Sequence, residues 1–222
     1  MRNPKCPYFN SCGGCDTQHL AYQEQLKNKA NRLAKAIKYD DIQIFSDQEY
    51  FYRNRMDLAF HKGGLGFRRK GSWLRIVDVE QCVISNPELN QLLTEVRTYF
   101  DEHGYDAYSL REKTGTFRYA VIRTPKGDSS ISFVVNSKSP DLQAAYKKVE
   151  DFSKKSSAKN ILITHESPES DRSTGNDYKV IKGSDELTGT YLGKPFQFFG
   201  ARVFSEQRRN GRKNASIRAW PD

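Results

Sequence analysis

The sequence has 222 residues, of which 36% are hydrophobic and 28% are charged, and 36 lysines and arginines against 27 aspartates and glutamates give a net charge of +9. No apolar run is long enough to span a bilayer, and the N-terminus lacks the apolar stretch of a secretory signal, so we expect a cytoplasmic protein with no membrane partner. The basic balance favours a polyanion as partner, because neutralised phosphates release counterions.

Cysteines are concentrated near the N-terminus. Cys6, Cys12 and Cys15 are separated by five and two residues, with a Gly-Gly pair between the last two, and Cys82 stands alone much further along. A reducing cytoplasm argues against disulfides. Four thiolates can complete the shell of a soft metal ion or hold an iron–sulfur cluster. Structural zinc sites usually show two close cysteine pairs, so the spacing favours the cluster and leaves zinc open.

A helix and then short strands follow the cysteines. Apolar residues recur at helical spacing over 17–37, and lysines and arginines fill the other, solvated face of that predicted helix. From about residue 52, short runs broken by glycine predict strands over 56–60, 66–69 and 73–79. A glycine cluster after the first strand indicates a hairpin, and the last strand leads to Cys82.

The same stretch interleaves basic residues with tyrosine, phenylalanine and tryptophan. Strands would display these side chains as a basic, aromatic surface suited to RNA. A plain solvated surface remains the alternative for each residue taken alone. The predicted RNA-contacting residues are Arg53, Arg55, Arg68, Arg69 and Lys70, together with Arg118 and Arg123 on a later strand.

Helices and strands are mixed in the remainder of the chain. The capping box Ser85-x-x-Glu88, with proline in the first turn, predicts the start of a helix that Gly104 ends. Another helix is predicted from Ser139. Strands are predicted over 117–124, 129–135, 161–164, 180–181 and 192–199, with a polar loop over 165–178. The mixture predicts an α+β fold, with the cysteine-rich loop and its helix followed by a mixed central β-sheet domain.

These segments resemble the RNA uracil-5-methyltransferase family, S-adenosylmethionine-dependent enzymes that make 5-methyluridine in tRNA and rRNA. The block CPYFNSCGGCDTQHLAYQEQLKNK is similar to the [4Fe-4S] motif of the cluster-bearing branch, and YRNRMDLAF and GLGFRRKGSWLRIVDVEQC continue the resemblance. The weaker segments FRYAVIR and YKVIKGSDELTGTYLGKPFQFFGARVFSEQ extend it over about residues 4–207. It implies that Cys6, Cys12, Cys15 and Cys82 bind one [4Fe-4S] cluster, and that a monomeric protein acts on 23S rRNA or tRNA.

Two domains typical of the family are not visible in the sequence: a small N-terminal β-barrel and a C-terminal Rossmann-like methyltransferase domain. The family reaction needs a thiolate that adds to C6 of uracil, and all four cysteines are assigned to the cluster. We therefore expect a fragment that is inactive alone, without catalytic or S-adenosylmethionine-binding residues. The expected parts are an iron–sulfur loop and helix at 1–46, a central RNA-binding domain at 47–200 and a truncated methyltransferase start at 201–222.

Two other classes of function compete with this interpretation. One is a stand-alone RNA-binding module, held together by a cluster or by zinc and without enzymatic activity. The other is a redox or radical cluster, which ranks low because radical enzymes that cleave S-adenosylmethionine use a tighter three-cysteine spacing and a barrel fold.

The resemblance stops abruptly near the C-terminus. Where family members typically carry Phe-Phe-Gln-x-Asn with a glutamine at the methyl-donor site, this chain reads FSEQR at 204–208. Loss of two bases from a run of T would convert one sequence into the other. We therefore expect 208–222 to be non-native in origin and disordered. We also expect that Gln207 is not the donor-site glutamine, and that the phenylalanine-rich edge at 196–199 is exposed.

Overall fold

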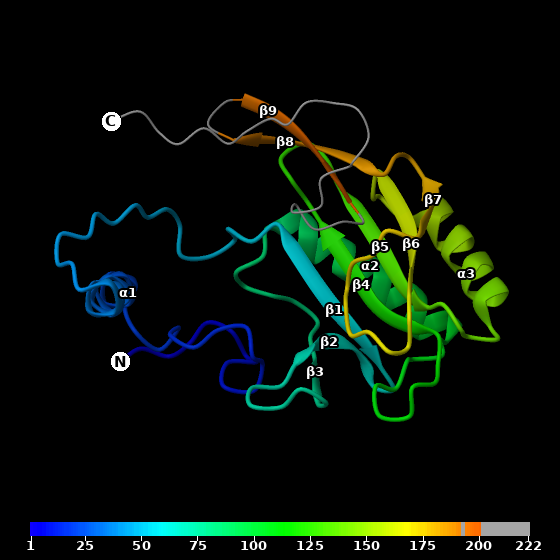
Figure 1. Cartoon of the computed structure of the whole chain (residues 1–222), viewed down its shortest axis with the longest axis horizontal. Coiled ribbons are helices and arrows are strands. Elements are labelled where there is room, and N and C mark those ends of the chain that lie inside the picture. The colour runs from blue at the N-terminus through cyan, green and yellow to red at the C-terminus, as the bar shows by residue number, and fades with distance from the viewer. Residues whose placement is uncertain (192–193, 201–222) are drawn as a thin grey trace.

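Residues 1–191 and 194–200 are described by a computed structural model of the chain (Figure 1). Gln207 and the tail predicted from residue 208 lie outside the described residues. The helices are α1 (Tyr22–Ile37), α2 (Pro87–His103) and α3 (Leu142–Lys155). The strands are β1 (Arg55–His61), β2 (Gly64–Arg68), β3 (Ile76–Asp78), β4 (Phe117–Arg123), β5 (Ser130–Asn136), β6 (Asn160–Glu166), β7 (Tyr178–Lys182), β8 (Glu186–Tyr191) and β9 (Lys194–Phe199).

A seven-stranded sheet in the order β3-β2-β1-β4-β5-β6-β7 forms the centre of the fold. Neighbouring strands are antiparallel except β5 and β6, which run parallel and are joined through α3, as a parallel connection requires. The strands β8 and β9 form a separate hairpin. The α+β prediction is therefore confirmed. So is the predicted glycine hairpin, because β1 and β2 pair up to His61 and Gly64 and leave a two-residue turn between them.

The main hydrophobic core lies between one face of the sheet and the helices α2 and α3. Alternate residues of the strands contribute to it, among them Leu58 of β1, Ile122 of β4 and Phe133 of β5, because side chains on a strand alternate between the two faces. From the helices, Phe100 and Phe152 pack on Phe133, with ring centroids 5.2 and 5.4 Å away. This packing explains why the apolar stripes of both helices could be read from the sequence.

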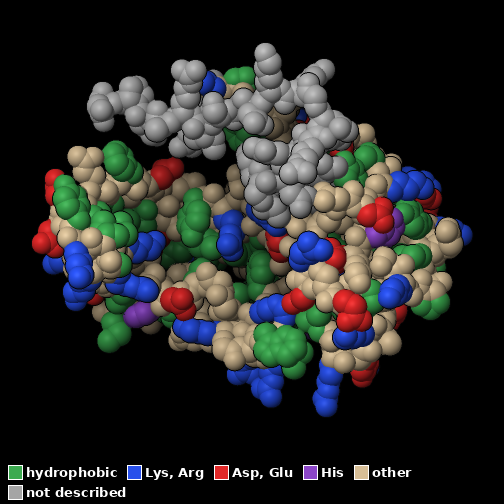
Figure 2. Space-filling view, in the orientation of Figure 1, with side chains coloured by type: hydrophobic (Ala, Val, Ile, Leu, Met, Phe, Trp, Pro, Cys, Tyr) green, Lys and Arg blue, Asp and Glu red, His purple; other side chains and the backbone are tan. Residues whose placement is uncertain are grey.

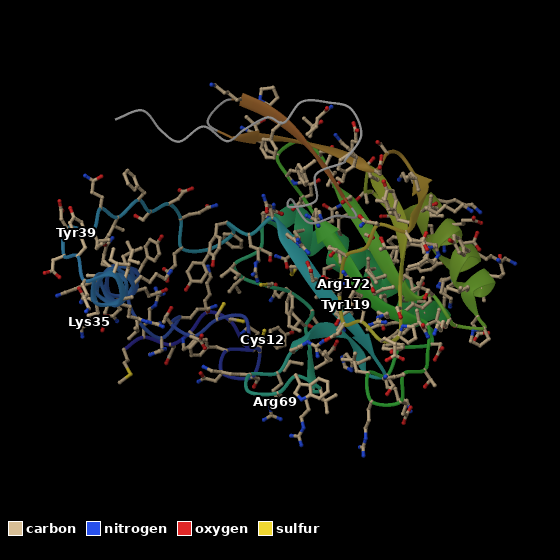
Figure 3. The ribbon with its side chains drawn as sticks, in the orientation of Figure 1. Cys12, Lys35, Tyr39, Arg69, Tyr119 and Arg172 are labelled. Atoms are coloured by element: carbon tan, nitrogen blue, oxygen red, sulfur yellow. The ribbon has the colours of Figure 1, made fainter. Side chains whose placement is uncertain are left out.

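The opposite face of the sheet, called the open face here, carries a small apolar cluster and many polar side chains. Ala59, Tyr119, Val121 and Val134 form the cluster, with Ile76 packed beside it. The two helices that pack on the sheet lie on the other side, and the loop 167–177 crosses this face instead. Tyr119 of β4 donates a hydrogen bond to Asp171 of that loop, and Figure 3 labels Tyr119 and Arg172 in this region of the molecule.

The N-terminal helix differs from the expectation. It begins at Tyr22 rather than at residue 17, and it stands apart from the sheet in Figure 1. Its apolar stripe is therefore largely solvent-facing, with Leu33 48% and Ile37 54% exposed. Periodicity predicted the helix correctly, but helical spacing alone does not say whether another element covers the stripe.

The helix α2 is capped differently from the predicted capping box. Asn86 is the N-cap, and its side-chain oxygen accepts a hydrogen bond from the Leu89 N–H at 2.8 Å. Ser85 is fully buried, and its hydroxyl has no hydrogen-bond partner within the described residues. Gly104, at φ 64°, ends the helix as expected.

The second hairpin was only partly predicted. The strand expected over 192–199 is observed as β9, whereas β8 was missed because ELTGTY lacks a clear apolar alternation. Phe196 and Phe198 stack with ring centroids 5.6 Å apart on β9 and are partly exposed. The edge expected to be exposed is thus partly shielded by its own side chains.

Gly66 lets β2 and β3 approach closely, and we expect its replacement by alanine to destabilise the fold. A Cβ at Gly66 would collide with the backbone of Val77, which cannot move aside without breaking the strand pairing. Overpacking of this kind costs roughly 1–3 kcal/mol. Urea unfolding of Gly66→Ala should show that loss. Gly63→Ala is the control, because there the Cβ meets only the His61 side chain. Equal stability of the two variants would contradict the argument.

Candidate cluster site and basic face

The four cysteines come together although 66 residues of sequence separate the third from the fourth. Cys6, Cys12, Cys15 and Cys82 line one cavity, and all four are half-buried. Apolar side chains complete its wall, including that of Phe67 on β2. In Figure 3, Cys12 lies between the N-terminal segment and the sheet. The predicted convergence of the cysteines at one site is therefore observed.

Backbone pairing fixes the cysteine-rich loop against the end of β2. The Gly13 N–H donates to the Arg68 carbonyl at 3.0 Å, and the Lys70 N–H donates to the Ser11 carbonyl at 2.8 Å. A Cβ at Gly13 would lie 3.1 Å from that same Arg68 carbonyl, so the site favours glycine. The Gly-Gly pair thus serves to bring the loop close to the sheet.

Cys82 is held by the first turn of α2. Its N–H donates to the Asn90 side-chain oxygen at 2.8 Å, and the Asn90 amide donates back to the Cys82 carbonyl at 3.0 Å. On the other side of the cavity, the Cys6 N–H donates to the side-chain oxygen of Gln18 at 3.2 Å. Sequence reasoning missed both Asn90 and Gln18, because each acts through a contact that depends on the folded loop.

The stretch before Cys82 is anchored by one ion pair. Arg97 of α2 donates to both oxygens of Asp78, at 2.6 and 2.9 Å, and to the Leu65 carbonyl at 3.0 Å. Burial raises the pKa of Asp78, but the hydrogen bonds from Arg97 and from the Leu65 N–H outweigh it, so the net pKa is lowered. The carboxylate is therefore charged at neutral pH and ties β3 to α2.

The cysteines are not arranged around a single-ion position. Among the described residues, no group of three or more histidine, cysteine, aspartate or glutamate side chains is placed to hold one metal ion. A tetrahedral zinc site with bonds of about 2.3 Å would bring the sulfurs to roughly 3.8 Å from one another. Burial raises the pKa of the Cys6 and Cys12 thiols. At Cys12 the Gly14 N–H, which donates to the sulfur at 3.4 Å, opposes this rise in part.

The predicted RNA-contacting residues of the β1–β3 region divide into exposed and paired ones. Arg53 and Arg69 are exposed, and Lys70 is exposed but pairs with Asp16 at 2.7 Å. Arg55 makes two hydrogen bonds of 2.7 Å to Asp57. Arg68 is also paired, with Asp171. Figure 2 shows lysine and arginine side chains over this side of the molecule, and Figure 3 places Arg69 at its lower edge.

Arg118 and Arg123 are buried, contrary to the surface role predicted for them. Arg118 is 3% exposed, stacks 4.2 Å from the Tyr108 ring centroid and donates to the Ser167 carbonyl at 2.7 Å. Arg123 is 6% exposed, and burial, followed by repulsion from Arg55, lowers its pKa to about 10. The Arg123 guanidinium still stays charged at neutral pH. Both side chains lie in the interior because β4 is a central strand, and the loop 167–177 lies over Arg118.

The loop 167–177 also brings a carboxylate, that of Asp171, to the basic surface. Asp171 accepts hydrogen bonds from Arg68 at 2.6 Å and from the Tyr119 hydroxyl at 2.5 Å. Burial and the bond to Asp171 raise the pKa of Tyr119 to about 12, so the hydroxyl keeps its proton and donates. Ser173 donates to Asp57 at 2.5 Å in the same way. The loop is thus fastened to the open face by polar contacts.

Comparisons with known proteins relate the chain to RNA methyltransferases. A tRNA (uracil(54)-C(5))-methyltransferase of Pyrococcus furiosus is 36% identical over 132 residues, covering 59% of this chain and 32% of that protein. An uncharacterised RNA methyltransferase of Leptospira interrogans is 30% identical over 204 residues, covering 87% and 44%. The chain's homologues are RNA methyltransferases. No model of a known protein family matches the chain.

The fold of the chain is also similar to part of one solved methyltransferase structure. The crystal structure of the Pyrococcus abyssi tRNA (uracil-54, C5)-methyltransferase in complex with S-adenosyl-L-homocysteine superposes with a TM-score of 0.71 at 23% identity, covering 90% of this chain and 48% of that one. The chain spans between 30% and 50% of the length of the curated relatives it matches. Within the described residues, no helix combines the length and apolar character needed to cross a bilayer.

Proposed function

We propose that the chain is the cysteine-rich and RNA-binding portion of an S-adenosylmethionine-dependent RNA (uracil-5-)-methyltransferase, which forms 5-methyluridine in tRNA or 23S rRNA. The observation that carries the proposal is homology to RNA methyltransferases along 87% of the chain, together with the shared fold. Its supposed parts are the cysteine-rich loop and helix at 1–46 and the central sheet at 47–200. The relatives favour this over a stand-alone RNA-binding module.

The cysteine cavity fits a [4Fe-4S] cluster by the chemistry of its donors. Cys6, Cys12, Cys15 and Cys82 would hold it, because four soft thiols from two distant segments face one apolar cavity. When bound, such a cluster supplies a cross-link between the N-terminal loop and the segment after β3. The hydrogen bonds of Asn90 and Gln18 orient two of the ligands, as outer-shell contacts do at metal sites.

The chain's own residues supply binding rather than methyl transfer in this proposal. The family reaction requires a thiolate that adds to C6 of uracil, which makes C5 nucleophilic. Every cysteine of this chain lies at the shared cavity, so none is left to attack a base. Arg53 and Arg69 are exposed and would contact phosphates in this proposal. We expect the chain by itself to bind RNA and to transfer no methyl group.

The proposal can be tested with two transcripts. The purified chain is titrated into a tRNA and into a 23S rRNA fragment, and the same mixtures are incubated with tritiated S-adenosylmethionine. The expected result is salt-sensitive binding to at least one transcript without label in the RNA. Absence of binding to both transcripts would overturn the RNA-binding role. Labelled 5-methyluridine would overturn the expectation that the chain by itself transfers no methyl group.

A further inference from the structure

A cleft on the open face of the sheet lies apart from the cysteine cavity. Its volume is about 400 Å³, within the range of small-molecule sites. Ala59, Ile76 and Tyr119 form an apolar and aromatic floor, since the first two belong to or pack against the open-face cluster that includes Tyr119. The stacked pair of Tyr108 and Arg118 adds a flat, buried wall. Flat surfaces of this kind suit an unstacked nucleobase.

Cations outnumber carboxylates around this cleft, since four lysine and arginine residues line it against Glu112 and Asp171. Lys62 and Arg111 line it and are exposed, and neither makes an ion pair with any residue in the described part of the chain. Arg68 lines it too, at the side nearer the cysteine-rich loop. An apolar floor with free cations at its rim matches a ligand that has one flat uncharged part and one anionic part.

Asp171 stands where the cleft meets a second hollow. That hollow, of about 390 Å³, reaches Gly13 and Gly14 of the cysteine-rich loop, and both hollows are lined by Arg68, Tyr119 and Asp171. The Asp171 carboxylate accepts from the Arg68 guanidinium and the Tyr119 hydroxyl together. A guanidinium and a hydroxyl that converge on one anion are also a suitable pair of donors for a phosphate.

We propose that this cleft binds one unstacked nucleotide of single-stranded RNA and that its phosphate replaces Asp171 at Arg68. The base lies on the floor of Ala59 and Tyr119, and the flanking phosphates meet the rim cations Lys62 and Arg111. The inference deepens the proposed function and rests on it. Asp171 then acts as an internal competitor, which keeps Arg68 and Tyr119 in place when no RNA is bound.

The test measures binding of a fluorescent single-stranded RNA decamer to the 222-residue chain by anisotropy. Ser109→Trp, which fills the cleft from its wall, should weaken binding by roughly tenfold, the value of one lost stacking contact. Asp171→Asn should tighten binding by about threefold, because it removes a competing surface ion pair. Gln143→Trp on α3, an exposed position, is the matched control and should bind as the unmodified chain does.

The proposal predicts that Ser109→Trp weakens RNA binding and that Asp171→Asn tightens it. A simple loss of structure would weaken binding in both variants. Uridine 5′-monophosphate should displace the decamer at concentrations where inorganic phosphate alone does not. If both variants bind the decamer as tightly as the unmodified chain, the cleft assignment fails while RNA binding stands. Displacement by polyglutamate but not by uridine 5′-monophosphate would assign the cleft to an acidic peptide instead and also overturn it. No binding of the decamer to the unmodified chain overturns the proposed function itself.

Discussion

Replacement of Cys82 by serine is expected to remove iron from the anaerobically purified chain and to loosen its N-terminal segment. The unmodified protein should be brown and carry about four irons, as a [4Fe-4S] cluster requires. Cys82 is the cavity's one cysteine from outside the N-terminal loop, so its loss removes the cross-link that a cluster would add and leaves the loop held by its backbone hydrogen bonds to the end of β2. Iron content and limited proteolysis within residues 1–46 would measure both effects.

The control for this experiment is Ser85→Ala. Ser85 is buried three residues after Cys82, and its hydroxyl has no hydrogen-bond partner in the described part of the structure. This variant should keep its iron and its resistance to protease. The main sheet should survive in Cys82→Ser, because its core does not depend on the loop. One tightly bound zinc and no iron in the unmodified protein would contradict the cluster.

The elements with a buried stripe were the ones that sequence could predict. The helices α2 and α3 and the strands β4, β5 and β6 show strong apolar patterns because they pack against the single core. The sequence also predicted which cysteines would come together, and the four line one cavity. The contacts of Asn90 and Gln18 were not predicted, because an isolated polar side chain has no periodic signal.

The arginines of β4 show where pattern reasoning fails. In the strand FRYAVIR, Arg118 and Arg123 flank an apolar run, and charged side chains at such positions usually face solvent. The structure buries both arginines. The distant loop 167–177 covers Arg118 and accepts its hydrogen bonds, and Arg123 lies near Arg55 and Asp57 of the neighbouring strand β1. The local sequence of a strand does not show whether a distant loop will cover it in the folded protein. The same loop also pairs Arg68, so the count of basic residues overstates the free positive charge of this surface.

Neutralising Arg68, Arg69 and Lys70 together to glutamine is expected to weaken RNA binding and to flatten its dependence on salt. Each phosphate contact on a single strand contributes about 0.7 to the slope of log affinity against log salt, so loss of three contacts would lower the slope by about 2. Because the proposed complex replaces Asp171 at Arg68 by a phosphate, the measured drop should fall below this value only by the share of Lys70 that stays paired with Asp16. Titrations at several salt concentrations supply both the affinity and the slope.

The matched control removes the same charge from the other side of the sheet. Lys147, Lys154 and Lys155 lie on α3, and their joint change to glutamine lowers the net charge by the same three units. If RNA binding reflected only the overall charge of +9, both triple variants would lose affinity equally. If RNA instead binds at one basic face, the α3 variant should keep the same slope of log affinity against log salt. An unchanged slope in the Arg68, Arg69 and Lys70 variant would remove this surface from the RNA interface, and the exposed Arg53 beside the cysteine cavity would be the next position to change.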